Sequence, residues 1–362
     1  MLVRRVWLTD FRSYHSADVE LAPGLTAILG ANGQGKTNLL EAIAYLATLT
    51  SFRGAPPEAL IRHGARSAIV RAEGSSDGRE LLIEAEIVAG GRNRVQVNRQ
   101  RLQRARDLLG ALRVSVFSPD DLELVKGAPA ERRRFLDDTL VSLHPRYDQL
   151  RTDLDRVLKQ RNALLKQSAG GTRFDESAAF TLDVWDSKLV EAGEALARAR
   201  RELVARARPQ IEDVYRALAG APEASVEARY ESAWAAEGLA AALAGARADD
   251  LRRGVSTVGP HRDDLWLAVD GLPARTYASQ GEQRSLALAM RLAAHAVVTV
   301  ESGSAPVLLL DDVFSELDEA HGDALLQRLP PGQTVLTSAA GLPAGARPEL
   351  VLRIDNGTVL AA

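Results

Sequence analysis

Residues 30–37 have the types and spacing of a phosphate-binding loop, Gly30-x-x-x-x-Gly35-Lys36-Thr37. Glycines here allow backbone N–H groups to turn inward around phosphate oxygens, and a following helix adds its positive N-terminus. We expect the Lys36 ammonium to reach the outer phosphates and the Thr37 hydroxyl to bind Mg²⁺. The other expected contacts in or beside this loop are Asn32, Gly33 and Asn38.

The flanking sequence supplies the elements that such a loop requires. Residues 25–29 form a short apolar run after Pro23-Gly24, which predicts a buried strand. After the loop, Leu39, Leu40, Ile43 and Leu46 recur at helical spacing. Strand, glycine loop and helix in this order favour a nucleotide site. The alternative is a glycine turn that only caps a helix.

A pair of aspartates near the other end of the chain follows a second apolar run. Residues 307–310 predict a central parallel strand, and Asp311 and Asp312 stand at its carboxyl end, where ligands bind in open α/β sheets. We expect Asp311 to hold Mg²⁺ and Asp312 to orient or deprotonate the attacking water. The alternative is a strand that ends at a polar turn.

Composition limits the remaining functions. The chain has 362 residues, 46% hydrophobic and 26% charged, with a net charge of −3 and no cysteine. This excludes disulfide and thiolate chemistry and a uniformly basic protein, so a nucleic-acid surface would be local. There is no run of 18 apolar residues, and the first residues are charged. We expect a cytoplasmic protein without a membrane partner.

The basic stretch at residues 87–106 is the first candidate DNA surface. It contains no acid between its arginines, which would contact phosphates without reading sequence. The expected contacts are Arg92, Arg94, Arg99, Arg101 and Arg104. Residues 132–134 are a second candidate, although they also predict a helix with i,i+4 ion pairs. No aromatic residues are interleaved, which favours duplex or junction backbone over stacked single strands. The alternative is a solvated charged face.

The middle of the chain predicts an inserted helical arm. Leu140, Leu143, Tyr147, Leu150, Leu154 and Val157 form one heptad-like seam, and Trp185, Leu189, Ala192, Leu196, Ala199 and Leu203 form another. A break at Gly170-Gly171 between them predicts an antiparallel hairpin, with a packed helical domain as the alternative. We expect Pro145 to begin or kink the first helix and Pro209 to end or break the second.

The order of these motifs resembles that of ABC-type ATPases. Ser279 to Gln283, including Gly281, resembles their signature motif, and residues 315–318, ending in Asp318, resemble their D-loop. In that family the signature binds the γ-phosphate held by a second subunit. The strand expected at 334–340 carries Thr337-Ser338 and no switch histidine, and no glutamine suits a Q-loop. These departures favour the SMC-like branch over transport ATPases.

Within that branch, residues 119–138, 259–265 and 277–293 resemble the RecF family over nearly the whole chain. The resemblance implies an ATP-dependent DNA-binding protein of recombinational repair and replication forks. It further implies ATP with Mg²⁺, an ATP-dependent homodimer, Arg12 near the ATP phosphates, and work with RecR and RecO in loading RecA. Weak DNA-dependent ATPase activity would accompany this role. No residue-level mechanism for Gly259 to Asp264 follows from the sequence.

These observations together predict an α/β fold, an ABC/SMC-type P-loop ATPase head with an inserted α-helical arm. The expected segments are 1–138 and 253–362 for the head and 139–252 for the arm. Two other functions remain open, the ATPase subunit of a transporter and a P-loop small-molecule kinase. A transporter subunit would co-purify with a membrane protein, and a kinase would have no use for a signature that acts on a second subunit.

Overall fold

The computed structural model describes residues 1–169 and 175–361, and these form two compact units. The first unit comprises Met1–Leu122, Gln210–Ala224 and Ser279–Ala362, and the second comprises Glu123–Pro209 and Ser225–Ala278. Gly170 and Gly171, which the sequence placed between two helical seams, lie outside the described residues.

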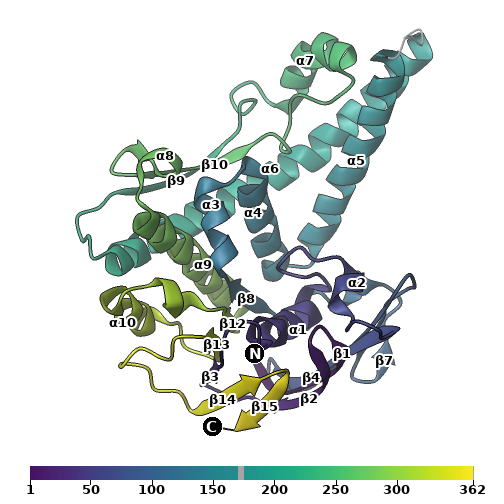
Figure 1. Ribbon diagram of the computed structural model, residues 1–362. Helices are drawn as coiled ribbons and strands as arrows, with labels where there is room; N and C mark the ends of the chain where they lie inside the picture. Colours follow the sequence, from purple (N-terminus) through teal and green to yellow (C-terminus); the bar gives the residue numbers. More distant parts are fainter. Residues whose placement is uncertain (170–174, 362) are drawn as a thin grey trace. The chain divides into compact units, whose positions relative to one another are not determined.

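The first unit contains two six-stranded sheets. One is antiparallel, in the order β2-β1-β4-β5-β6-β7, and the other is mostly parallel, in the order β15-β14-β3-β13-β12-β8 (Figure 1). The elements are β1 (Leu2–Phe11), β2 (Tyr14–Glu20), β3 (Leu25–Leu29), α1 (Lys36–Thr48), α2 (Pro57–Leu60), β4 (Ser67–Ser76), β5 (Arg79–Val88), β6 (Arg94–Val97), β7 (Gln100–Arg101), η1 (Ala105–Leu108), β8 (Val114–Phe117), η2 (Pro119–Leu122), α9 (Gln280–Ser302), β12 (Val307–Leu310), η3 (Val313–Glu316), α10 (Glu319–Arg328), β13 (Thr334–Ser338), β14 (Leu350–Asp355) and β15 (Thr358–Ala361).

Two hydrophobic cores cover both faces of the mostly parallel sheet. Strand β12 shows this by alternation, because successive side chains point to opposite faces. Val307 and Leu309 join the core that α1 shares with the antiparallel sheet, whereas Leu308 and Leu310 join a core with α9 and α10. All four residues of β12 are therefore buried, as the uninterrupted apolar run predicted.

The second unit consists of helices and a small sheet of order β11-β10-β9. Its elements are α3 (Glu123–Lys126), α4 (Pro129–Leu143), α5 (Arg146–Ala169), α6 (Glu176–Ala219), β9 (Val226–Glu231), α7 (Leu239–Arg253), β10 (Asp264–Val269), β11 (Leu272–Pro273) and α8 (Ala274–Tyr277). Helices α5 and α6 lie side by side (Figure 1), joined by an ion pair between Arg161 and Asp186. Helix α7 also packs on this pair, so the expected hairpin is part of a packed helical unit.

The prediction for Pro145 is confirmed, and the prediction for Pro209 is wrong. Helix α4 ends at Leu143 and α5 begins at Arg146, so Pro145 starts a helix as expected. The prediction for Pro209 was wrong, because α6 continues through it to Ala219. The residues beyond Pro209 keep helical burial, with Ile211 and Tyr215 almost fully buried. Packing of this face outweighs the single backbone hydrogen bond that proline removes.

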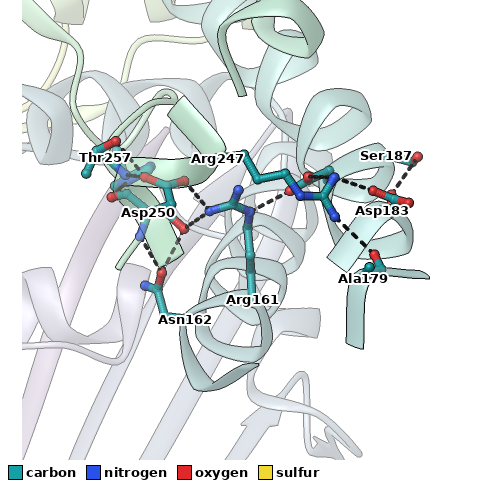
Figure 2. Close-up of polar contacts among 11 residues, drawn as sticks. Arg161, Asn162, Ala179, Asp183, Ser187, Arg247, Asp250 and Thr257 are labelled. Atoms are coloured by element: carbon teal, nitrogen blue, oxygen red, sulfur yellow. Dashed lines mark hydrogen bonds and ion pairs between the residues drawn. The ribbon is translucent and has the colours of Figure 1, made fainter. Parts of the chain in front are cut away.

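A buried ion-pair network joins three helices of the second unit (Figure 2). The Arg161 side chain on α5 has no exposed surface. Its guanidinium donates to Asp186 of α6 at 2.6 Å, to Asp250 of α7 at 2.7 Å and to Ser256 at 2.9 Å. Asp250 also accepts from the backbone and hydroxyl of Thr257. A buried charge is costly unless it is paired, so these contacts fix the helices against one another.

The segment Gly259 to Asp264 holds the small sheet to α4 within the same unit. The Asp263 carboxylate accepts hydrogen bonds from the Tyr230 hydroxyl, the Ser232 hydroxyl and the Trp234 indole at 2.7, 3.0 and 2.9 Å. Asp264 forms a bidentate ion pair with Arg132 at 2.7 and 2.8 Å. The two acidic residues that end this segment therefore stabilise the second unit through contacts within it.

None of the described helices combines the length and the apolar character that crossing a lipid bilayer requires.

Candidate functional site

The phosphate loop lies between β3 and α1, where two of its glycines meet close neighbours. A Cβ on Gly30 would lie 2.5 Å from the carbonyl oxygen of Ile354 on β14. Gly35, the residue before α1, has φ 113°, and a Cβ there would lie 2.9 Å from the Ser13 hydroxyl. Side chains at either position would force this tight turn apart. The glycine spacing therefore has a steric cause.

Lys36 lies folded into this loop. Its ammonium donates to the carbonyl oxygens of Gly30 at 2.7 Å and Ala31 at 3.0 Å, and the residue is only 5% exposed. Tyr14 supports the loop from β2 by donating its hydroxyl to the Gly35 carbonyl at 2.9 Å. Burial raises the pKa of the Tyr14 phenol, so this donor keeps its proton. The sequence analysis gave Tyr14 no role.

The phosphate loop and the aspartate pair, which are far apart in the sequence, meet at Asp311. The Thr37 hydroxyl donates to Asp311 Oδ1 at 2.8 Å, which confirms that the phosphate loop and the end of β12 are adjacent. The Thr337 hydroxyl, at the end of β13, donates to the same oxygen at 2.8 Å. Burial raises the pKa of Asp311, and the hydrogen bonds from Thr337 and Thr37 act in the opposite direction.

Asp312 follows in a left-handed backbone conformation, with φ 49° and ψ 32°. Its N–H donates to the Thr337 hydroxyl at 2.9 Å, and its carboxylate accepts from the Ala339 N–H at 3.1 Å. The end of β13 therefore holds the backbone of this residue, and the first residue after β13 holds its carboxylate. The sequence analysis noted that Thr337 lies in the strand where transport ATPases carry a switch histidine, but it predicted no contact for Thr337.

Arg12 packs against the first helix of the head. Its guanidinium donates to both carboxylate oxygens of Glu41 on α1, each at 2.8 Å, and to the Ala59 carbonyl at 2.9 Å. Glu41 is fully buried and also accepts from the Ser51 hydroxyl at 2.5 Å. The sequence analysis missed Glu41. Its position could have been noticed because it is an acidic residue among the apolar residues of this helix. Asn38 donates to the Ser13 hydroxyl at 3.0 Å, beside the same loop.

The signature residues form the first turn of α9. Ser279 and Glu282 make a reciprocal capping box, in which the Glu282 N–H donates to the Ser279 hydroxyl at 3.3 Å and the Ser279 N–H donates to the Glu282 carboxylate at 2.7 Å. Ser279 and Gly281 are exposed, whereas Gln283 is buried. Asp318 caps α10 by accepting from the His321 N–H at 2.9 Å. These capping contacts are local to α9 and α10.

The expected DNA-contacting arginines lie at the β6–β7 edge of the antiparallel sheet. Asn98 and Arg99 form the two-residue turn between these strands, both with positive φ. Arg94 pairs with Glu86 at 3.3 Å, and Arg92 donates to the Gln103 carbonyl at 3.3 Å. Among the described contacts, Arg99, Arg101 and Arg104 form no side-chain hydrogen bond or ion pair, and all three are exposed.

The second arginine cluster is engaged inside the second unit. Arg132 is 5% exposed and pairs with Asp264, and Arg133 donates to the Asp263 carbonyl at 2.8 Å. Arg134 forms the expected i,i+4 pair with Asp138 at 3.8 Å. Tertiary contacts with the segment at 259–264 therefore occupy two of the three cations of this cluster, which favours its alternative interpretation as a paired structural helix.

The mostly parallel sheet, the phosphate loop and the Asp311 strand define an ABC-type ATPase fold of the SMC kind, with an inserted helical unit. Residues 2–335 match the family described as the RecF/RecN/SMC N terminal domain. A solved Smc head domain of Pyrococcus furiosus, bound to the C-terminal domain of ScpA, is 17% identical with a TM-score of 0.59 and shares the fold.

Proteins with higher sequence identity to this chain identify its family within this class. The DNA replication and repair protein RecF of Streptomyces avermitilis is 45% identical, with 99% of each chain covered, and that of Frankia alni is 46% identical, with 92% of each covered. A solved structure of the recombination mediator protein RecF-ATP in the RecFOR pathway is 28% identical with a TM-score of 0.90, and covers 99% of this chain and 97% of that one. The chain belongs to the RecF family of DNA replication and repair proteins. This membership sets aside the transporter subunit and the small-molecule kinase.

Proposed function

We propose that this protein binds DNA under the control of ATP, dimerises around two ATP molecules, and uses slow hydrolysis for release. The observation that carries the proposal is the junction of Thr37 and Asp311 at 2.8 Å beside a loop that already holds the Lys36 ammonium. A hydroxyl, a carboxylate and a buried cation at one helix N-terminus suit a Mg²⁺-bound polyphosphate.

The donor set fits magnesium with a nucleotide better than magnesium alone. No group of three or more histidine or acidic side chains in the described parts of the chain could hold a metal ion. Thr37 and Asp311 supply two oxygens, and a bound nucleotide and water would complete an octahedral shell. Bound Mg²⁺ would neutralise charge on the phosphates during transfer to water. Asp312 would orient or deprotonate that water, and its shorter reach than a glutamate suggests a low rate.

The first turn of α9 supports a signature that acts on a second subunit. Gly281 is a helical glycine, and in the described parts of the chain no atom beyond its neighbours and its own helix backbone lies within 4 Å of where its Cβ would be. Glycine inside a helix costs up to about 1 kcal/mol relative to alanine. Packing within the chain does not account for this cost, whereas close approach of a phosphate from a partner would. Ser279 and Gly281 are exposed, as such an approach requires.

The DNA contact is assigned to the β6–β7 edge. Arg99, Arg101 and Arg104 are exposed there, while Glu84 and Glu86 occupy the outward positions of β5 next to it. Exposed arginines thus gather at this edge of an overall acidic protein. Guanidinium groups in this arrangement would bind duplex or junction phosphates without sequence preference. Arg92 and Arg94 would add to this surface after exchanging their present partners.

The names of the relatives support the cellular role. Curated relatives are DNA replication and repair proteins, and a solved relative with ATP belongs to the RecFOR pathway. We assign this chain to recombinational repair with RecO and RecR, in the cytoplasm, with RecA loading as the outcome.

Molecular mass in solution tests the proposal most directly. We expect monomers without nucleotide or with ADP, dimers with ATP and Mg²⁺, and a more persistent dimer when duplex DNA is added. Light scattering after size-exclusion chromatography measures each state. A mass that is the same in all nucleotide states, from a chain that binds ATP, would refute ATP-controlled dimerisation.

A further inference from the structure

Strand β13 lies between the two strands that carry the nucleotide site. The order β3-β13-β12 places it next to the phosphate-loop strand on one side and the Asp311 strand on the other. Thr337 is opposite Ile28 of β3, and Leu336 is opposite Leu310 of β12. Parallel strands present their carboxyl ends at one edge, so the end of β13 reaches both halves of the site.

The Thr337 hydroxyl makes two hydrogen bonds at this edge. It donates its one proton to Asp311 Oδ1 at 2.8 Å and accepts from the Asp312 N–H at 2.9 Å. The residue has no exposed surface, so water cannot replace either contact. A hydroxyl has one proton and two lone pairs, and these two bonds therefore fix its orientation.

The two contacts act on two different properties of the aspartates. Asp311 is 5% exposed, and its Oδ1 accepts from both Thr337 and Thr37, each at 2.8 Å. Two donors on one oxygen restrict the rotation of this carboxylate, and Mg²⁺ requires ligands held in a well-defined orientation. Asp312 needs a left-handed backbone that an L-residue adopts at a cost, and the bond from its N–H to Thr337 helps to hold it there.

We propose that Thr337 is a positioning residue of the nucleotide site, which fixes the orientation of the Asp311 carboxylate and the backbone from which the Asp312 carboxylate is aimed. The inference rests on the proposed function, in which this site binds ATP with Mg²⁺. Thr37 alone could not do both tasks, because its hydroxyl contacts Asp311 only.

The test compares Thr337→Val, which removes the hydroxyl and keeps the shape, with Thr337→Ser, which keeps the hydroxyl. The matched control is Thr334→Val, the same change at the other end of β13, at a residue that is also buried. Hydrolysis by the full chain is measured against MgCl₂ concentration at fixed ATP, and ATP binding is measured by calorimetry with and without MgCl₂.

We expect Thr337→Val to require roughly ten- to a hundredfold more Mg²⁺ for half-maximal hydrolysis, since it loses a hydrogen bond to a charged group. For Thr337→Ser and Thr334→Val, the Mg²⁺ concentration for half-maximal hydrolysis should stay within about twofold of that of the unmodified chain. ATP binding without Mg²⁺ should be unchanged in all three.

A folded Thr337→Val chain with an unchanged Mg²⁺ requirement would overturn the inference. A Thr337→Ser chain that shifts as far as Thr337→Val would also overturn it, because the hydroxyl would then not be the cause. If Thr337→Val and Thr337→Ala both fail to fold, the hydroxyl supports the fold and the inference is wrong. An unmodified chain that binds no ATP with Mg²⁺ would instead refute the proposed function.

Discussion

Replacing Ser279 by arginine separates a signature that acts on a second subunit from one that acts on its own. Within its own chain, Ser279 contributes the capping box of α9, with contacts of 3.3 and 2.7 Å to Glu282. Loss of such a cap costs about 1 kcal/mol, a small part of the roughly 5–15 kcal/mol by which a domain is stable. Ser279→Arg should therefore fold and bind ATP normally through its own phosphate loop. ATP-induced dimers and hydrolysis should be lost.

Mixing this variant with Lys36→Ala gives the decisive measurement. Ser279→Arg supplies a good phosphate loop and Lys36→Ala supplies a good signature, so a heterodimer contains one intact composite site of two. Neither variant forms ATP-induced dimers with itself, so the dimers that form are heterodimers, and the mixture should regain up to about half of the unmodified activity. The assay is ATP hydrolysis in the presence of duplex DNA.

The control is the double variant Lys36→Ala/Ser279→Arg, which provides no intact composite site with either single variant. Recovery in that mixture would point to contaminating activity. If the two single variants fold but regain nothing when mixed, Ser279 acts within its own subunit. Loss of ATP binding by monomeric Ser279→Arg would refute the reasoning directly, once circular dichroism shows a folded chain.

Three further outcomes are expected. Lys36→Ala should abolish ATP binding in calorimetry, because it removes the cation fixed in the phosphate loop; normal binding would contradict the loop assignment, and Lys188→Ala on α6 is the control. Replacing Arg99, Arg101 and Arg104 by glutamate should weaken DNA binding and lower its salt dependence by up to about three counterions; an unchanged slope in titrations at several salt concentrations would move the DNA surface elsewhere. Burial lowers the pKa of His295 to about 4, below about 6.5 in the unfolded chain, so the unfolded state takes up the proton first and stability falls between these values. From pH 7 to pH 5 the loss should be about 2 kcal/mol in urea unfolding, and His295→Gln should not show it.

The sequence alone determined the local parts of the nucleotide site. The phosphate loop, the strand at 307–310 and the helix that Ser279 begins are set by glycine conformations, apolar runs and helix capping, which depend on neighbours along the chain. The structure places all three where the sequence predicted them. The sequence also suggested that Thr37 and Asp311 share a site, because strand ends in a parallel sheet meet at one edge.

Only the tertiary structure decided which side chains hold those parts in place. Tyr14, Glu41 and Thr337 support the site through contacts across 21, 29 and 26 sequence positions respectively. No periodicity encodes such contacts, because they depend on how separate elements pack. The same reason explains why the sequence did not predict the role of Arg132. Its place in a run of three arginines suggested an exposed side chain, but it is buried and paired with Asp264.

Helix α6 shows where local rules and packing disagree. Proline predicts a helix end from the backbone of its own residue and the one before it. The chain instead remains helical to Ala219, and the stretch from Gln210 joins the first compact unit while the residues up to Pro209 belong to the second. Burial of side chains on both sides of Pro209 stabilises the helix by more than one missing hydrogen bond costs. That balance is set by neighbours far away in the sequence, so only the folded chain could decide it.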